Sequence, residues 1–370
     1  MNIALNADRF DDEIIIPTML ENIQPHYQSG ETRKFSNAPN IDLSIYNKII
    51  LAISGGKDSL ACLLALIEQG ADLSKVELWH HDVDGREGST LMDWTFMRDY
   101  NIKLAEHFDL PIYFSWLQGG FEGEMLKVDS FSQSHIIETP DGFKKLARNN
   151  KTTKRSKPST RLKFPQQSAS LATRWCSSAV KIDVGRRQIT NQERFNHSNV
   201  LFITGERREE SSKRATYNQL EYHSNDARAG RLGRRVDAWR PILSWSEEKV
   251  WEIIARHRIH AAVPYQLGWN RSSCMNCIYN DDVIWATIAH YFPWRAKAIN
   301  DYEVQFNLSI SRSKKTVLER IKGVKPIIVN DEKLIIQATT EEYFMPIALK
   351  ETEHWVLPAG AFGKGKSGAD

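Results

Sequence analysis

The chain has 370 residues, 41% of them hydrophobic, and its 49 Lys and Arg nearly balance its 46 Asp and Glu, for a net charge of +3. Such a chain can bury a substantial core and is expected to form two or three domains, or one α/β domain with appendages. No stretch is apolar for the length of a membrane span, and acids precede the first apolar run, which makes the N-terminus a poor secretory signal. Four cysteines without such a signal indicate reduced thiols, metal binding or catalysis, so we expect a cytoplasmic enzyme with no membrane partner.

Composition along the chain predicts four regions. Residues 1–45 are expected to form an N-terminal extension packed on the main domain, and residues 46–245 an α/β domain. Residues 246–325 are predicted to form a helical region that carries a cysteine pair. Residues 326–370 are expected to be a C-terminal segment with a disordered Gly- and Lys-rich tail.

Short apolar runs alternate with helical patterns, which predicts right-handed βαβ units and a doubly wound, mostly parallel sheet. The predicted strands are 49–53, 76–82, 111–116 and 199–204, and the predicted helices among them are 60–70 and 90–107. Sheets of this kind bind ligands beyond the carboxyl ends of their strands, where the strand order reverses. The residues that follow these strands are therefore candidates for a binding site.

The motif SGGKDS lies between the first predicted strand and its helix. Free N–H groups at a helix N-terminus and the helix dipole attract anions, and Gly55 and Gly56 let the backbone approach a phosphate closely. Lys57 adds a mobile cation, and Ser54 and Ser59 add hydroxyl donors. The motif therefore predicts a phosphate-binding loop.

The loop is not a Walker A motif, because Leu51 and Asp58 stand where that motif needs a glycine and a Ser or Thr. A second polar strand end, HHDVDG, offers His81, Asp82 and Asp84 as metal ligands. The alternative is a polar strand end that is capped by an Asp-Gly turn.

A third strand end opens the run GERREESSKR at Gly205. Arg207, Arg208 and Arg214 are candidates to neutralise a triphosphate, with Glu210 orienting them. The alternative is an exposed helix start that is held by salt bridges.

Basic runs in the sequence indicate a polyanionic partner. Residues 144–181 carry 11 Lys and Arg and no Asp or Glu, and RAGRLGRR at 228–235 is also basic and broken by glycine. Both are predicted to be loops, and residues 311–322 a further basic helix. Solvated surface charge is the alternative, but two unbalanced runs favour contact with nucleic acid.

The motif SGGKDS resembles the PP-loop of the ATP pyrophosphatase superfamily, whose members cleave ATP between the α and β phosphates. Together with RWCSSAVK, TGERREESSKRA and RPILSWSEEKVW…CMNC, in this order, it is similar to the phosphoadenosine phosphosulfate (PAPS) reductase branch. Two features differ from that branch: Lys57 is present in the loop, and no cysteine follows Cys277. The chain therefore more closely resembles the thiolating members, including the sulfurtransferases of DNA phosphorothioation systems (DndC-type and SspD-type).

This resemblance implies ATP and Mg²⁺ as cofactors, with Asp58 helping to hold the metal on the triphosphate and Asp82 near the adenosine. The residues expected to contact the nucleotide are Ser54, Gly55, Gly56, Lys57, Asp58, Ser59, Asp82, Gly205, Glu206 and Arg208. The residues expected to be catalytic are Lys57, Asp58, Arg207, Arg214 and Cys176.

The cysteines allow three interpretations. Cys62 lies within a predicted helix and is expected to be core, which leaves Cys176, Cys274 and Cys277. By the resemblance, these three would hold a [4Fe–4S] cluster with one iron free for sulfide. A zinc site completed by a His, or thiols of which one carries a persulfide, are the alternatives.

We therefore expect an ATP-dependent sulfurtransferase that releases AMP and pyrophosphate. It would adenylate a substrate oxygen and replace AMP by sulfur supplied by a cysteine desulfurase. The acceptor is expected to be nucleic acid, the DNA backbone first and a tRNA base second. A sulfonucleotide reductase or sulfate-assimilation enzyme is the first alternative, and a nucleotide-sensing module without turnover is the second.

Overall fold

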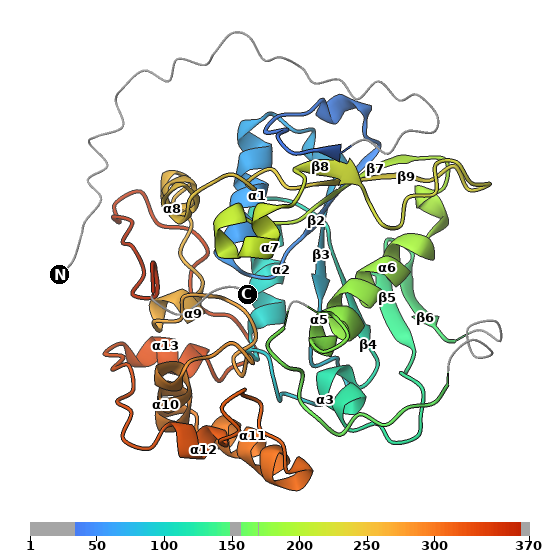
Figure 1. The fold of residues 1–370 in the computed structure, drawn as a ribbon. Coiled ribbons are helices and arrows are strands. Elements are labelled where there is room, and N and C mark those ends of the chain that lie inside the picture. Colours follow the sequence, from blue (N-terminus) through green and yellow to red (C-terminus); the bar gives the residue numbers. More distant parts are fainter. Residues whose placement is uncertain (1–33, 149–156, 169, 364–370) are drawn as a thin grey trace.

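The computed structural model describes residues 34–148, 157–168 and 170–363. Most of the predicted N-terminal extension, part of the first basic run and most of the predicted disordered tail lie outside the described residues. Figure 1 shows the described part as a sheet flanked by helices, with the C-terminal helices grouped at one side.

A nine-stranded sheet runs through the described part, in the order β1-β8-β9-β7-β2-β3-β4-β5-β6. The strands are β1 Lys34–Phe35, β2 Lys48–Ala52, β3 Val76–His81, β4 Ile112–Leu117, β5 His135–Thr139, β6 Gly142–Leu146, β7 Asn199–Ile203, β8 Leu220–Tyr222 and β9 Arg235–Trp239. The four predicted strands are thereby confirmed to within one residue at each end. The hairpin β5–β6 falls partly in a stretch predicted to be a basic loop, and its pairing with β4 extends the sheet instead.

The five central strands are parallel, and both edges are antiparallel. The chain adds β3 and β4 on one side of β2, then returns to add β7 and β9 on the other side. The strand order therefore reverses between β2 and β7, which creates a crevice beyond their carboxyl ends. The predicted doubly wound, mostly parallel sheet is confirmed.

Alternating side chains of the central strands enter two different apolar clusters. Ile49 and Leu51 of β2 face the larger cluster, whereas Ile50 between them packs in a smaller cluster with Trp79 of β3. Both faces of the parallel sheet are thus covered, which is why its strands read as continuous apolar runs.

The helices are α1 Lys57–Glu68, α2 Met97–His107, α3 Gly120–Met125, α5 Trp175–Ser177, α6 Asp183–Thr190, α7 Ser212–Ala215, α8 Glu247–Arg256, α9 Val263–Gln266, α10 Asp282–Tyr291, α11 Pro293–Phe306, α12 Val317–Arg320 and α13 Glu332–Gln337. The helical C-terminal region is confirmed. Its apolar residues belong to the same core cluster as those of the sheet, and the members of this cluster range from Ala38 to Tyr343 in the sequence. No helix of the described residues has the length and apolar character needed to cross a membrane.

Two helix predictions need correction. The helix expected over 90–107 begins only at Met97, because the carboxylate of Asp84 accepts the N–H groups of Met92 and Asp93 and holds the preceding residues in turns. The basic helix expected over 311–322 is reduced to α12, which a Thr316 cap begins. By contrast, the side chain of Ser246 caps α8 as its sequence predicts.

Candidate functional site

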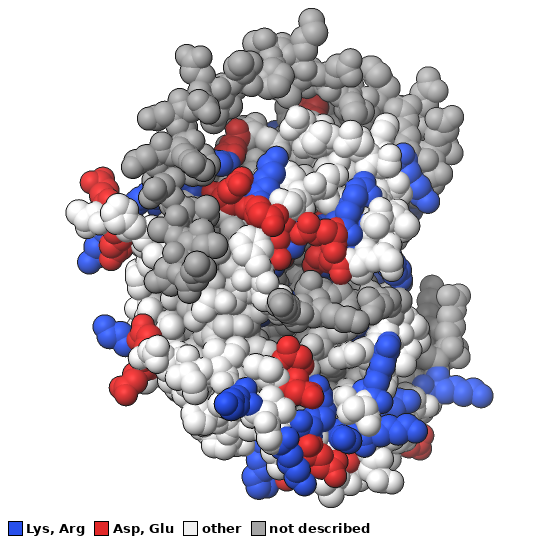
Figure 2. Space-filling view, turned by 60° about the vertical axis from the view of Figure 1, so that its left-hand side comes forward, with Lys and Arg blue, Asp and Glu red and all other residues white. Residues whose placement is uncertain are grey.

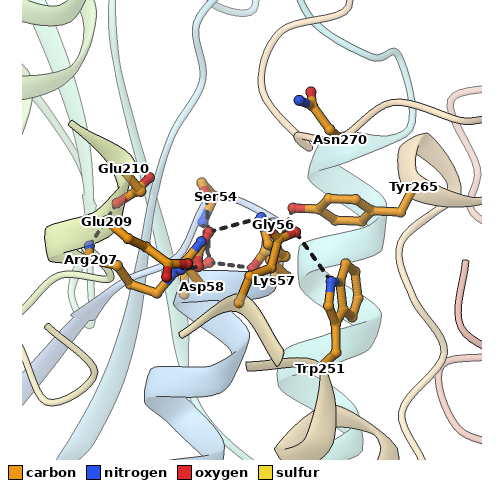
Figure 3. A network of polar contacts seen from close by, with 12 residues as sticks. Ser54, Gly56, Lys57, Asp58, Arg207, Glu209, Glu210, Trp251, Tyr265 and Asn270 are labelled. Carbon is orange, nitrogen blue, oxygen red and sulfur yellow. Dashed lines mark hydrogen bonds and ion pairs between the residues drawn. The ribbon is translucent and has the colours of Figure 1, made fainter. Parts of the chain in front are cut away.

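A cavity of about 500 Å³ lies beyond the carboxyl ends of β2 and β7, at the reversal of strand order. The PP-loop and the residues after β7 line one part of it, and the segment that precedes the cysteine pair lines another. Figure 3 shows the PP-loop part, where Arg207 and Asp58 point toward each other and the ring of Tyr265 points toward the loop.

The PP-loop has the backbone shape that an anion site needs. Gly55 has a φ of +74°, which residues with a Cβ rarely adopt, and a Cβ there would lie 2.3 Å from Sδ of Met97. The hydroxyl of Ser59 donates to the carbonyl of Gly56 at 2.9 Å and accepts the N–H of Ser54 at 3.3 Å. These bonds hold the turn closed at the start of α1.

An aromatic pair from the C-terminal region completes the loop. The backbone N–H of Lys57 donates to the hydroxyl of Tyr265 at 3.0 Å. The Lys57 ammonium lies 5.5 Å from the ring centroid of Tyr265 and 5.9 Å from that of Trp251. Trp251 is 1% exposed, which confirms the prediction that it belongs to the core. Its ring also lies beside the ammonium of Lys57.

The charges at the loop form one chain of contacts. The Lys57 ammonium lies 3.5 Å from Asp58 and 3.6 Å from Glu247, and Arg207 Nε donates to Asp58 at 2.6 Å. Burial alone would lower the pKa of Lys57, but Tyr265, Asp58 and Glu247 outweigh it and raise that pKa. Burial opposes ionisation of Asp58, but Lys57 and Arg207 keep its pKa below the ordinary value. The loop therefore presents a charged lysine at the cavity.

The loop after β7 approaches α1 closely. A Cβ on Gly205 would lie 2.8 Å from the backbone carbon of Asp58, so glycine is needed there. Arg207 and Arg214 line the cavity, and Glu210 pairs with Arg214 and accepts the N–H of Arg207 at 2.7 Å.

Two predicted nucleotide contacts from the arginine run have different positions. Glu206 lines the cavity and lies 3.4 Å from Arg240. The guanidinium of Arg208 is turned away and donates to the carbonyls of Ala215, Tyr217 and Ser36. Its contacts are those of a residue that holds the loop in shape.

The HHDVDG segment divides between two cavities. His81 lines the cavity that contains the PP-loop, Asp82 and Asp84 line a neighbouring cavity of about 590 Å³, and His80 lines both. Asp82 pairs with Arg86 at 2.8 Å, and Asp84 accepts backbone N–H groups. These contacts match the alternative of a polar strand end that is capped by hydrogen bonds.

Beyond the PP-loop, the cavity reaches Cys274 and Lys181. Lys181 lies in a π-helical turn, Ser178–Ile182, an irregularity that is frequent at functional sites. Burial alone would lower the pKa of Lys181, but Cys274, Asp93 and the other two thiols raise it above its ordinary value. Burial likewise raises the pKa of Cys274 well above the ordinary value.

All three thiols thus influence the pKa of one lysine, but the described residues do not arrange them as a metal site. Cys274 lines the cavity, whereas Cys176 and Cys277 are not among the lining residues. In the described part of the chain, no three His, Cys, Asp or Glu side chains are arranged to hold a metal ion. The predicted cluster or zinc ligation by these cysteines therefore has no fitting donor set.

Three cations that line the cavity were not among the site residues predicted from the sequence. Lys181, Arg186 and Arg271 all line it, and none forms an ion pair with another described residue. One guanidinium nitrogen of Arg271 is buried without a hydrogen-bond partner among the described residues. Lys181 could have been suspected from its place in RWCSSAVK, but no local signal marks the other two.

The fold and the cavity together define a nucleotide-binding α/β protein with an anion-binding loop at its switch point. The family model of the phosphoadenosine phosphosulfate reductase domain matches residues 133–280. This part of the chain is therefore similar to the PAPS reductase domain, and the loop SGGKDS lies outside the matched residues.

Two curated relatives match parts of the chain. An uncharacterized 37.8 kDa protein in the gpa 5′ region of Escherichia phage 186 is 27% identical over 181 residues, or 49% of this chain and 50% of the phage protein. The adenosine 5′-phosphosulfate reductase of Neisseria meningitidis is 34% identical over 76 residues, or 20% of this chain and 28% of the reductase. The chain thus spans half or less of the length of these relatives.

The solved structures that match parts of the chain include two complexes of FMN adenylyltransferase from Candida glabrata. Its complex with FAD and inorganic pyrophosphate has a TM-score of 0.31 and 11% identity, covering 60% of this chain and 53% of that one. Its complex with FMN and an ATP analogue has a TM-score of 0.30 and 11% identity, covering 61% and 54%.

Proposed function

We propose that this protein is an ATP pyrophosphatase that adenylates an oxygen of nucleic acid and then replaces AMP by sulfur. The observation that carries the proposal is one continuous cavity, with the PP-loop in one part and Cys274 among unpaired cations in another. ATP and an anionic acceptor could meet in such a cavity, with a thiol beside them.

The PP-loop end has the groups that cleavage at the α-phosphorus needs. Negative charge develops on the triphosphate as an acceptor oxygen attacks and pyrophosphate leaves. Lys57, Arg207 and Arg214 offer fixed positive charge there, and fixed donors stabilise a developing charge without reorganisation. Bound Mg²⁺ would neutralise and clamp the phosphates, and Asp58, an oxygen donor that lines the cavity, would hold it.

The acceptor end supports an anionic substrate. Arg207 and Arg214 are already paired with Asp58 and Glu210, whereas Lys181, Arg186 and Arg271 lack a carboxylate partner among the described residues. Arg186 is exposed, and Lys181 and Arg271 are half-buried, so an incoming anion can reach these cations and pair with them. A phosphodiester supplies both this charge and an oxygen to adenylate, so we place the DNA backbone first and tRNA second.

Sulfur transfer is assigned to a persulfide on Cys274, because this thiol lines the cavity. The terminal sulfur attacks the adenylated phosphorus, a sulfur–phosphorus bond forms and AMP leaves. The Cys277 thiol then attacks Sγ of Cys274, which releases the thiolated product and leaves a Cys274–Cys277 disulfide. An external dithiol reduces this disulfide, and a cysteine desulfurase restores the persulfide. Cys176, whose thiol also raises the pKa of Lys181, is the alternative attacking thiol.

A [4Fe–4S] cluster on the three cysteines remains the competing source of sulfur in this proposal. Because the described residues contain no group arranged to hold a metal, no step is assigned to a cluster. Iron and sulfide analysis of protein purified without oxygen distinguishes the two, since a persulfide carrier contains neither iron nor acid-labile sulfide.

The proposal is tested by supplying duplex DNA, Mg·ATP, cysteine, a cysteine desulfurase and a dithiol. We expect DNA-dependent release of AMP and pyrophosphate together with nuclease-resistant phosphorothioate dinucleotides. Cys274→Ser should still release pyrophosphate but form no phosphorothioate. Cys62→Ala is the matched control, because Cys62 is buried in α1 and does not line the cavity. ATP binding without pyrophosphate release, under any of these conditions, would instead support a nucleotide-sensing module.

Sulfonucleotide reduction is the second candidate, favoured by the family match over residues 133–280 and by the adenosine 5′-phosphosulfate reductase relative. It predicts sulfite formation from a sulfonucleotide and a dithiol without ATP. Production of sulfite with no cleavage of ATP would replace our proposal with this one.

A further inference from the structure

We propose that the segment Ser311–Lys325 is a docking surface for the phosphodiester backbone of nucleic acid. The inference rests on the proposed function in one respect, since it assigns the surface on which the acceptor strand is held. Binding can nevertheless be measured without catalysis, so the docking surface and the proposed function are tested separately.

The segment has an excess of unpaired positive charge. Five of its cations are exposed and form no ion pair with another described residue: Arg312, Lys314, Lys315, Lys322 and Lys325. The one acid in its sequence, Glu319, is engaged locally, because it accepts the N–H of Thr316 at 2.8 Å. Figure 2 shows Lys and Arg gathered at the lower end of the molecule, where Figure 1 places α11 and α12.

A buried carboxylate fixes the shape of this segment. Glu303, at 2% exposure, accepts the N–H of Ile310 at 2.9 Å and the N–H of Val317 at 2.7 Å. Ile310 and Val317 are themselves buried, so both ends of the intervening loop are anchored. Lys314 and Lys315 therefore lie on a loop whose two ends are fixed by the protein core.

The segment also packs against the loop that carries the cysteine pair. Arg312 donates to the carbonyl of Gln167, whose side chain donates to the carbonyl of Ile278 at 2.6 Å. Arg320 donates to the carbonyl of Asn280 at 3.1 Å. The same loop, at its other end, lines the cavity with residues 271–274.

This placement favours nucleic acid over other polyanions. A strand held on the segment would lie beside the cysteine loop, and the cavity beyond that loop contains its own unpaired cations, Lys181, Arg186 and Arg271. A chain of phosphates can engage both sets of cations, because its charges repeat along its length. Binding to an anionic membrane or an acidic protein would explain the exposed cations of Ser311–Lys325 but not the cations inside the cavity.

The test is binding of the full chain to a fluorescent 30-base-pair duplex and to its single strand, measured by anisotropy over a salt series. We compare wild type with K314Q/K315Q, and with K322Q/K325Q. The matched control is K333Q/K350Q, which removes two charges from exposed lysines elsewhere in the C-terminal region. Each lost phosphate contact should lower the slope of log K against log salt by about one.

We expect weaker binding with a smaller salt slope for the two segment variants and no change for the control. ATP binding should equal that of wild type, because these lysines do not line the cavity. Equal losses in the control, no binding by wild type at low salt, or binding to phosphatidylserine vesicles but not to DNA would each overturn the inference. DNA binding through the segment with no pyrophosphate release would leave it standing and refute the proposed function.

Discussion

The hydroxyl of Tyr265 accepts the backbone N–H of Lys57, although the two residues lie 208 positions apart in the chain. Lys57 is the first residue of α1, and its N–H is among the helix-start donors that have no partner within the helix. The C-terminal region therefore completes the PP-loop, and the loop is not a self-contained motif in this protein.

Replacing Tyr265 with Phe should loosen the loop while keeping the ring beside the lysine. The change leaves the N–H of Lys57 without its acceptor, at a cost of about 1–3 kcal/mol in stability if no water replaces it. We expect weaker ATP binding, measured by calorimetry, and a lower midpoint of urea unfolding.

Tyr343→Phe is the matched control, because Tyr343 is also buried and its hydroxyl has no hydrogen-bond partner among the described residues. It should bind ATP as wild type does. If both variants bind ATP like wild type, the bond from Lys57 to Tyr265 does not support the loop.

Replacing Lys57 with Met should remove catalysis more than folding. The Lys57 side chain is 5% exposed, and its ammonium lies between Asp58, Glu247 and two aromatic rings, a position suited to a charge on the triphosphate. Loss of one such group should lower the rate of pyrophosphate release by about 10²–10³-fold.

Lys333→Met, at an exposed lysine outside the cavity, serves as the control for lost positive charge. A Lys57→Met protein that releases pyrophosphate at the wild-type rate would remove this lysine from the catalytic assignment.

Gly205→Ala should separate the loop after β7 from the start of α1. The added Cβ would lie 2.8 Å from the carbonyl carbon and 2.9 Å from the carbonyl oxygen of Asp58, and both atoms belong to the backbone. We expect a loss of about 1–3 kcal/mol in the free energy of unfolding and weaker ATP binding.

Gly123→Ala provides the comparison, because a Cβ at this position in α3 meets nothing within 4 Å. Its stability should match or exceed that of wild type, since alanine favours a helix. Equal stability of the two variants would show that the loop adjusts freely around Asp58.

His81 should make the protein less stable as the pH falls. Burial lowers the pKa of His81 from 6.5 to about 3, so the unfolded chain binds a proton that the folded state excludes between these values. The stability from this group is complete above pH 6.5 and is lost as the pH falls toward 3, by at most about 1.4 kcal/mol per pH unit.

The Ser115 hydroxyl donates to Gln188 and therefore accepts from Nδ1 of His81 at 2.8 Å, a bond that His81→Asn can retain without a titrating group. Urea unfolding at pH 7, 6, 5 and 4 should show a smaller loss for this variant than for wild type. His107→Asn, at an exposed position, should follow wild type. Parallel curves for wild type and His81→Asn would contradict the assignment.

The sequence by itself determined the features that depend on neighbours in the chain. Apolar runs that end at Ser54 and Gly205 predicted strands of the parallel sheet, because both faces of these strands are buried. Ser246 predicted the start of α8 through its own side chain, which accepts the N–H of Lys249. The ordered motifs predicted a resemblance to the PAPS reductase domain, and the family model of that domain matches residues 133–280.

Only the tertiary structure decided which of several equivalent residues face the cavity. Arg207 and Arg208 are adjacent and chemically identical, yet the first reaches Asp58 and the second binds backbone carbonyls away from the cavity. Arg271 and Lys181 lie 90 positions apart in the sequence and line the same cavity as Cys274. Periodicity and caps are local, whereas burial and counter-charges come from segments that are distant in the chain, so folding had to bring these groups together before their roles could be assigned.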